Sequence, residues 1–455
     1  MKNNIVEKNK IYEVHIDDIG HNGEGIGRIE GFTVFVQGGV PGDDLRVKIE
    51  LVKKNYAVGK IIKLVAPSPS RIIPVCPIAD TCGGCQTQHI DYKEQLRLKT
   101  NTVKANIERI GKLEGVLIHD TLGMEEPSRY RNKAQFPVGN LDNEVAIGFY
   151  KKGTHEIVNT SSCYIQHEVN DRIVEVLREY MERYKVSAFD EENGMGLIRH
   201  ILTKVGFTTG EIMIVLITNR RKIPHQEELI QALISEVPEI KSIVQNINMK
   251  KTNRILGDEC ITLFGDDKIV DYIGSLKFHI SALSFFQVNP MQTKVLYEKA
   301  LEYAGLTGEE TVFDVYCGIG TISLFLAQKA KKVYGIEIVD AAIEDAKENA
   351  RINGVENAEF FVGKAEEVVP RLYKKGITAD VVVVDPPRKG CEEEVLDTIV
   401  KMNPKRVVYV SCNPSTLARD LKYLDERGYR TVEVQPVDMF PHTTHCEAVV
   451  KIERV

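Results

Sequence analysis

The chain has 455 residues, of which 43% are hydrophobic and 27% are charged. At roughly 150 residues per domain this length indicates about three domains, and the balance of residue types excludes wholesale disorder. No apolar run approaches the ~20 residues of a membrane span, and residues 1–10 are polar, so we expect a cytoplasmic protein without a secretory signal or a membrane partner. The net charge of −6 argues at face value against a nucleic-acid partner.

Residues 11–65 predict a small β module. Short apolar runs at 13–16, 32–36, 45–51 and 57–65 are separated by turn signals, among them Gly25-Ile26-Gly27. About five strands in so short a stretch are typical of a small barrel of the oligonucleotide-binding type. Prolines follow at positions 67, 69, 74 and 77. We therefore expect the first domain to span residues 1–67.

The middle of the chain mixes helical and strand-like patterns. Apolar residues recur at helical spacing from 92 to 111, and we expect this helix to pack on the last domain. Strand-like runs follow at 145–150, 212–218 and 242–248, and helix-like runs at 167–184 and 226–235. These patterns predict a central α+β domain at residues 68–280.

The last 170 residues or so alternate short buried-type strands with helices. The strand-like runs are 311–315, 332–336, 358–361, 381–384 and 406–410, and helical stretches such as 322–329 and 341–353 lie between them. This alternation predicts a doubly wound, parallel α/β sheet at residues 281–455, which makes the chain a multidomain α/β protein. Ligands of such a sheet gather at the carboxyl ends of its strands.

A glycine-containing loop follows the first of these strands, in the segment FDVYCGIGT at 313–321. Gly318 and Gly320 let the backbone approach a ligand closely, and Glu337 ends the next strand, where an acid can accept hydrogen bonds from ribose hydroxyls. A dinucleotide fingerprint needs a third glycine where Ser323 stands. The pattern therefore resembles the S-adenosyl-L-methionine site of class I methyltransferases, with a purely structural turn as the alternative.

Three further strand ends carry reactive side chains. Asp385-Pro-Pro-Arg388 follows a buried strand, and Arg388 stands where amine methyltransferases carry a stacking aromatic residue, which argues against an exocyclic amine as target. Cys412 lies between a strand and a predicted helix, whose N-terminus, with Arg388 or Arg419, would favour the thiolate. A buried, unreactive cysteine is the alternative. Glu447 starts the last strand as a base for this cysteine, or as a solvated carboxylate.

In this order, the segments resemble the bacterial RNA uracil-5-methyltransferase family, which makes 5-methyluridine. The shared motifs are S-C-N-P-x-T-L-A-R-D around Cys412, D-P-P-R from Asp385, H-x-E ending at Glu447, and F-x-Q-x-N from Phe285. The resemblance implies that Cys412 is the nucleophile and Glu447 the proton acceptor. It also implies that the methyl donor lies beside Gln287, Tyr316, Gly318, Gly320, Thr321, Glu337 and Asp385. The family often has phenylalanine at Tyr316 and asparagine at Thr321.

The chemistry of this family explains why these residue types are needed. Carbon-5 of uracil is too weak a nucleophile to accept a methyl group unaided. Attack of the Cys412 thiolate on carbon-6 makes an enolate that is nucleophilic at carbon-5. After methyl transfer, Glu447 removes the carbon-5 proton and the thiolate is expelled. The target base must leave its stack to reach such a pocket.

Nine cysteines in a chain without a visible signal peptide indicate metal binding or catalysis rather than disulfides. Cys76, Cys82 and Cys85 lie within ten residues, in CPIADTCGGC, and predict metal ligands. Cys163 matches the family's fourth position, and the ribosomal branch of the family holds a [4Fe-4S] cluster here. Structural zinc is the alternative. Cys260, Cys317, Cys391 and Cys446 are expected to be non-ligands.

The β module looks like the TRAM domain of the ribosomal branch, whereas the tRNA-modifying branch usually lacks both that domain and the cluster. We therefore expect 23S rRNA as substrate and a monomeric enzyme, with tRNA, another RNA base or a non-catalytic RNA-binding role as alternatives. Residues 46–112 contain 13 Lys and Arg against five Asp and Glu. This local excess of positive charge reverses the first inference from the net charge, because phosphate binding can concentrate there.

Overall fold

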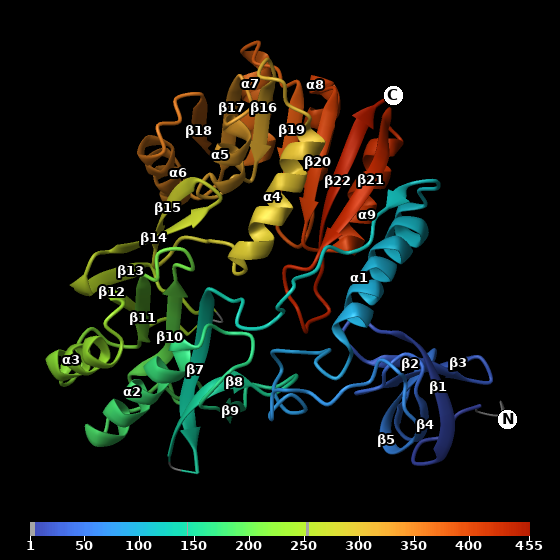
Figure 1. The fold of residues 1–455 in the computed structure, drawn as a ribbon, viewed down its shortest axis with the longest axis vertical. Coiled ribbons are helices and arrows are strands. Elements are labelled where there is room, and N and C mark those ends of the chain that lie inside the picture. Colours follow the sequence, from blue (N-terminus) through green and yellow to red (C-terminus); the bar gives the residue numbers. More distant parts are fainter. Residues whose placement is uncertain (1–4, 143, 252–253) are drawn as a thin grey trace.

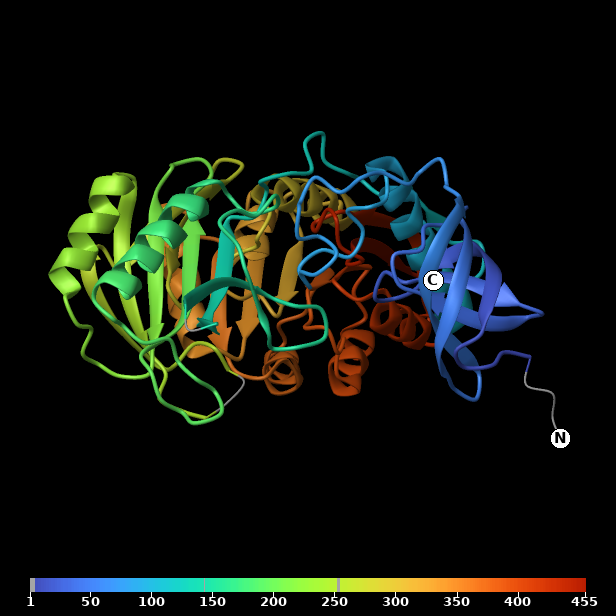
Figure 2. The same cartoon turned by 90° about the horizontal axis from the view of Figure 1, so that it is seen from below.

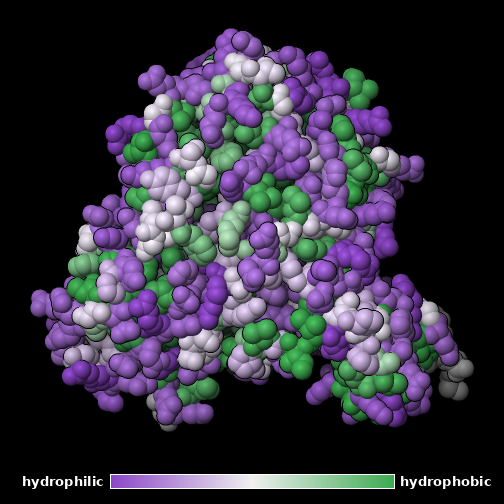
Figure 3. Space-filling model, viewed as in Figure 1, coloured by the Kyte–Doolittle hydropathy of each residue, from purple (hydrophilic) through white to green (hydrophobic). Residues whose placement is uncertain are grey.

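The computed structural model describes residues 5–142, 144–251 and 254–455. In Figure 1 the barrel lies at the lower right, the central sheet at the lower left and the C-terminal α/β unit above them. Seen from below, the barrel and the central sheet occupy opposite ends of the molecule (Figure 2). The face shown in Figure 3 is mainly hydrophilic, with scattered apolar patches. Within the described ranges, no helix combines the length and the apolar character that a membrane crossing requires.

The N-terminal module is a closed five-stranded barrel in the order β1-β2-β3-β5-β4, as predicted. Its strands are β1 (Ile11–Ile19), β2 (Gly25–Ile29), β3 (Phe32–Val36), β4 (Asp44–Val52) and β5 (Tyr56–Ala66). The interpretation of Gly25-Ile26-Gly27 as a turn was wrong, since these residues begin β2. A Cβ atom on Gly27 would lie 2.3 Å from the His15 carbonyl oxygen, so glycine is needed for close strand approach rather than for a turn.

Residues 67–91 connect the barrel to helix α1 (Tyr92–Asn106), which continues as a π-helical turn at Ile107–Gly111. The side chain of Asp91 caps α1 by accepting a hydrogen bond from the Lys93 N–H (3.0 Å). Val103 and Ile107 belong to the same apolar cluster as Leu417 of helix α9 (Pro414–Asp425). Helix α1 therefore packs on the C-terminal unit, although the central region separates the two in sequence.

The central region forms a seven-stranded sheet in the order β13-β12-β11-β10-β7-β8-β9. Its strands are β7 (Lys133–Leu141), β8 (Glu144–Tyr150), β9 (Ile157–Asn159), β10 (Ile198–Val205), β11 (Ile212–Thr218), β12 (Ile240–Ile247) and β13 (Glu259–Gly265). Helices α2 (Val169–Arg183) and α3 (Gln226–Glu236) bury apolar side chains against this sheet. A hairpin of β14 (Lys268–Ile273) and β15 (Leu276–Ser281) leads to the last unit.

The C-terminal sheet has the order β18-β17-β16-β19-β20-β22-β21-β6. Its strands are β16 (Thr311–Val315), β17 (Lys332–Glu337), β18 (Ala358–Val362), β19 (Val381–Val384), β20 (Arg406–Ser411), β21 (Tyr429–Val437), β22 (Glu447–Arg454) and β6 (Leu117–Ile118). Besides α9, its helices are α4 (Pro290–Ala304), α5 (Thr321–Ala327), α6 (Asp340–Ile352), α7 (Ala365–Lys374) and α8 (Glu393–Met402). The doubly wound α/β fold is confirmed. The sheet is not wholly parallel, because β22 runs antiparallel to both β20 and β21.

Candidate functional site

The predicted site residues come from one edge of the C-terminal sheet. Glu337 ends β17, Asp385 follows β19, and Cys412 follows β20. Because β22 is antiparallel to β20, its first residues lie beside the end of β20, and Ser411 pairs with Ala448. This reversal brings Glu447, from the start of β22, to the same edge as Cys412.

The loop between β16 and α5 is curled by alternate residues in the left-handed region. Tyr316, Gly318 and Gly320 have φ angles of +72°, +54° and +82°. A Cβ atom on Gly318 would meet nothing within 4 Å, whereas one on Gly320 would meet Ala346 Cβ at 3.2 Å. The backbone of Gly318 therefore faces open space, and Gly320 is needed for packing against α6. A non-glycine residue at φ +72° stores backbone strain, which is concentrated at functional sites.

Hydrogen bonds from the neighbouring elements hold this loop. The Gly318 N–H donates to Glu337 Oε2 (3.2 Å), which joins the glycine loop to the end of β17. The hydroxyls of Thr321 and Tyr297 share a hydrogen bond of 2.9 Å. Beneath the loop lies Asp314, whose pKa burial raises to about 7. The structure thus adds Tyr297, from α4, as a residue that orients Thr321. Its position on an ordinary helix left no sequence signal for this role.

Asp385, Cys412 and Glu447 are close enough to change one another's ionisation. Burial raises the pKa of Glu447 to about 7. Burial, followed by the charges of Glu447 and Asp314, holds the pKa of Asp385 well above its usual range. Burial and then the charges of Glu447 and Asp385 raise the pKa of the Cys412 thiol to about 11. The two carboxyl groups are therefore coupled, because ionisation of one disfavours ionisation of the other.

Cys412 lies at the N-terminus of α9, directly before the cap residue. Asn413 accepts a hydrogen bond from the Ser415 N–H (3.0 Å) and donates through Nδ2 to the Arg388 carbonyl oxygen (3.0 Å). These bonds tie the cysteine loop of β20 to the Asp-Pro-Pro-Arg loop of β19. Arg388 favours the thiolate, as expected, but burial and the carboxylates outweigh it. Arg419 instead pairs with Asp420.

Gln287 lies on the segment that links β15 to α4, and it is buried. The side chain of Asn132 donates to the Gln287 carbonyl oxygen (2.9 Å), and the Asn132 N–H donates to the Val288 carbonyl oxygen (2.9 Å). Asn132 belongs to the segment Tyr130-Arg-Asn-Lys133. Hydrogen bonds from the central region therefore hold the backbone at Gln287 in place.

The four predicted ligands Cys76, Cys82, Cys85 and Cys163 are free thiols. Burial, and to a smaller extent the charges of the other three thiols, raise the pKa of Cys85 to about 12. The Gly84 N–H donates to Cys82 Sγ (3.3 Å), an interaction that suits a thiolate ligand. Among the residues that the structure describes, no group of three or more His, Cys, Asp or Glu side chains is arranged to hold a metal ion. The donor set is chemically suited to a cluster, but it is not gathered into a closed metal site.

A cavity of about 860 Å³ separates the barrel from α1. Its barrel wall carries Phe35 and Tyr56, whose rings meet edge to face with centroids 5.4 Å apart. Its other walls include Asn101 of α1, Ser415 of α9 and Thr443, which precedes β22. The cavity is therefore bounded by the start of α9 and by the connection that leads into β22.

Comparisons with known proteins agree with this geometry. A family model described as tRNA (uracil-5-)-methyltransferase matches residues 91–455, and one described as TRAM domain matches residues 6–62. An uncharacterized RNA methyltransferase of Bacillus cereus is 54% identical over 450 residues, which are 99% of this chain and 98% of that protein. One from Clostridium tetani is 54% identical over 451 residues, with the same shares.

A solved structure is also similar over nearly the whole chain. It is the Pyrococcus abyssi tRNA (uracil-54, C5)-methyltransferase in complex with S-adenosyl-L-homocysteine. The similarity has a TM-score of 0.77 and 28% sequence identity, and it covers 97% of this chain and 100% of that one.

Proposed function

Because this chain belongs to the tRNA (uracil-5-)-methyltransferase family, and is thus an S-adenosyl-L-methionine-dependent RNA methyltransferase, we propose that it methylates carbon-5 of a uridine in 23S rRNA. The observation that carries the proposal is the convergence of Asp385, Cys412 and Glu447 at one edge of the sheet, beside the open backbone of Gly318. A thiol and a carboxylate in one cleft are the two groups that this reaction requires.

In the proposed reaction Cys412 is the nucleophile. Its thiolate adds to carbon-6 of the flipped uracil, and carbon-5 of the resulting enolate takes the methyl group. Glu447 then accepts the proton from carbon-5, the bond from Cys412 to carbon-6 breaks, and the thiolate leaves. Burial raises the pKa of Glu447, which makes its carboxylate a stronger base for this proton. Asp385 positions the base and the methyl donor.

We propose that the methyl donor lies along the curled loop after β16. Gly318 lets the backbone approach the donor closely, Gly320 keeps the loop in shape by packing against α6, and Glu337 accepts hydrogen bonds from the ribose hydroxyls. The other proposed contacts of the methyl donor are Tyr316, Thr321, Asp385 and Gln287. The relative in complex with S-adenosyl-L-homocysteine supports the class of donor. The hydrogen bond to the Tyr297 hydroxyl fixes the orientation of Thr321.

For the cysteine loop we propose a [4Fe-4S] cluster held by Cys76, Cys82, Cys85 and Cys163. Burial raises the pKa of Cys82, Cys85 and Cys163, and the charges of neighbouring thiols of the set contribute to each rise, which supports this donor set. When bound, such a cluster would crosslink the loop to the segment that follows β9. Anaerobically purified protein should contain iron and acid-labile sulfide. Cys85→Ser should lose both, whereas Cys260→Ser, at an exposed cysteine of β13, should keep both. Zinc without sulfide would refute the iron–sulfur assignment.

A second candidate substrate is tRNA. The similarity to a tRNA (uracil-54, C5)-methyltransferase covers 97% of this chain, so the barrel does not by itself separate rRNA from tRNA enzymes. The cavity beside Phe35 and Tyr56 supports an extended RNA strand, since a base can stack on an exposed ring. We also propose that the protein acts as a monomer in the cytoplasm.

One experiment tests the proposed function. The protein is incubated with radiolabelled S-adenosyl-L-methionine and either unmethylated 23S rRNA or unmethylated tRNA, and the product nucleoside is identified by mass. We expect 5-methyluridine in 23S rRNA. If 5-methyluridine is found only in tRNA, the substrate is tRNA and the 23S rRNA proposal is wrong. If 5-methyluridine is found in neither RNA, the proposed function is wrong. Cys412→Ala should form no covalent complex with RNA that contains 5-fluorouridine.

A further inference from the structure

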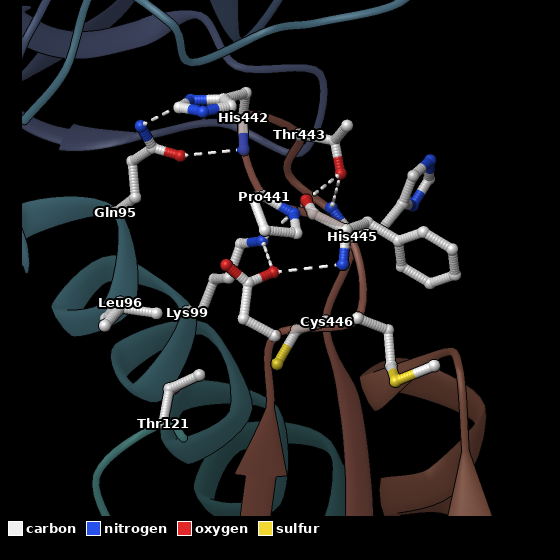
Figure 4. A network of polar contacts seen from close by, with 12 residues as sticks. Gln95, Leu96, Lys99, Thr121, Pro441, His442, Thr443, His445 and Cys446 are labelled. Atoms are coloured by element: carbon white, nitrogen blue, oxygen red, sulfur yellow. Dashed lines mark hydrogen bonds and ion pairs between the residues drawn. The ribbon is translucent and has the colours of Figure 1, made fainter. Parts of the chain in front are cut away.

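The connection between β21 and β22, residues 438–446, carries the proposed base at its end. Val437 ends β21 and pairs directly with Glu447, the first residue of β22. Asp438 therefore lies next to the residue that holds Glu447 in register. Figure 4 shows that Gln95 and Lys99 point from α1 toward this connection.

Asp438 is the anchor of the connection, and Lys99 is its charged partner. Lys99 Nζ lies 2.5 Å from Asp438 Oδ1, and the two residues are 4% and 0% exposed. Lys99 Nζ also donates to the Phe440 carbonyl oxygen (3.1 Å), so one ammonium group binds both a side chain and the backbone of the connection. The Tyr92 hydroxyl donates to Asp438 Oδ2 (2.9 Å). An ion pair shielded from water in this way is expensive to break from one side, because the other charge stays buried.

The middle of the connection is held by Gln95 and by the end of the cysteine loop. Gln95 Oε1 accepts a hydrogen bond from the His442 N–H (3.0 Å). The backbone N–H groups of Gln86 and Thr87 both donate to the His442 carbonyl oxygen (2.9 and 3.1 Å). His442 has a φ angle of +68°, a strained conformation that these contacts maintain. The path of the chain into Glu447 is thus set by elements outside the C-terminal sheet.

We infer that Lys99 is a positioning residue for the reaction, which acts through Asp438 to hold Glu447 where it can remove the carbon-5 proton. The inference rests on the proposed function. Lys99 forms no hydrogen bond or ion pair with Cys412 or with the glycine loop. Its hydrogen bonds go to Asp438 and to the Phe440 carbonyl oxygen. Its loss should therefore affect the step that needs Glu447 more than the steps that need Cys412 or the methyl donor.

The two steps can be separated with two RNA substrates. RNA that contains 5-fluorouridine forms the cysteine adduct and takes the methyl group, but it has no carbon-5 proton for a base to remove. With ordinary RNA, a misplaced base leaves the methylated adduct waiting on Cys412. A positioning role therefore predicts normal adduct formation on fluorinated RNA, slow turnover on ordinary RNA, and accumulation of the covalent complex on ordinary RNA.

The test compares Lys99→Met with Lys104→Met, which removes the same charge from an exposed position on the same helix. For Lys99→Met we expect turnover to fall about tenfold or more, a fraction of what a general base contributes. The rate of adduct formation on fluorinated RNA should stay close to that of the natural protein, and the covalent complex on ordinary RNA should be visible on denaturing gels. Lys104→Met should show no such separation of the two rates.

A second variant guards against simple loss of folding. Lys99→Met combined with Asp438→Asn leaves no unpaired buried charge and keeps an acceptor for the Tyr92 hydroxyl. We expect it to fold stably and still accumulate the covalent complex. If turnover recovers with stability, or if adduct formation and turnover fall together or not at all, Lys99 has no positioning role. Failure of the natural protein to form any fluorouridine adduct would instead contradict the proposed function.

Discussion

Replacement of Gly318 by alanine tests whether the curled loop after β16 receives the methyl donor. Gly318 has a φ angle of +54°, and a Cβ atom there would meet nothing within 4 Å. The substitution should therefore cost only the strain of a left-handed alanine, about 1 kcal/mol of folding free energy. A methyl group that faces open space destabilises the protein no further. It would, however, occupy the space through which the ligand approaches the backbone of the loop.

Gly376 supplies the matched control. It has a φ angle of +82°, and its Cβ atom would also meet nothing within 4 Å. It lies in the turn between α7 and β19, at the amino ends of the strands and so at the opposite edge of the sheet. Gly376→Ala should carry the same backbone strain without a methyl group near the proposed ligand site.

The two variants are compared by thermal unfolding without ligand and by calorimetric titration with S-adenosyl-L-homocysteine. Both melting temperatures should fall by a similar small amount, about 2–4 °C per kcal/mol for a unit of this size. Only Gly318→Ala should bind the ligand more weakly, by about tenfold or more, which corresponds to about 1.4 kcal/mol. Unchanged affinity in Gly318→Ala, or equal weakening in both variants, would refute the placement of the donor along this loop.

Two further predictions follow from the charges. Burial first, and then the charges of Glu447 and Asp385, raise the pKa of Cys412 to about 11. Glu447→Gln removes one of these charges, so alkylation of Cys412 by iodoacetamide at pH 8 should accelerate, about tenfold for each unit by which the pKa falls; an unchanged rate, measured by peptide mass, would contradict the electrostatic coupling. In the barrel, burial raises the pKa of Asp43, but hydrogen bonds from Arg71 and the backbone lower it overall. The stabilisation is therefore complete above the unfolded pKa of about 3.9 and is lost as the pH falls through the folded value. Asp43→Asn should destabilise the barrel by about 3 kcal/mol at pH 7 and should flatten this acid dependence, as followed by chemical denaturation.

The sequence located the strands of the C-terminal sheet well because short, wholly apolar runs have few alternatives. The runs 311–315 and 381–384 agree with β16 and β19 to the residue. The prediction of strands and turns was wrong in β2, where Gly27 allows close approach of two strands and does not form a turn. It also missed β6. Leu117 in β6 pairs with Glu433 of β21, and a two-residue strand that pairs across such a separation leaves no local periodicity.

The ionisation of the candidate nucleophile could not be predicted either. From the sequence, Cys412 has a helix N-terminus and two arginines to favour its thiolate. In the structure Arg419 is engaged by Asp420, and two carboxyl groups from other strands face the thiol instead. The effect of Glu447 on the pKa of Cys412 depends on the antiparallel direction of β22, which cannot be predicted from a local sequence pattern. The sequence therefore names Cys412 and Glu447 as candidates, and only the fold shows that burial and two nearby carboxyl groups raise the pKa of the candidate thiol.

Lys99 shows which sequence signal could have revealed a positioning residue. The buried side chains of α1 are Gln95, Leu98, Lys99 and Val103, so a lysine interrupts the apolar stripe of the helix. Lysine is almost never fully buried unless it is paired, so such an interruption predicts an acidic partner in the surface that the helix covers. The partner, Asp438, is 339 residues away, and no local pattern could identify it. Once α1 is placed against the start of the connection to β22, that pairing leads directly to Glu447, the residue on which the release of product is proposed to depend.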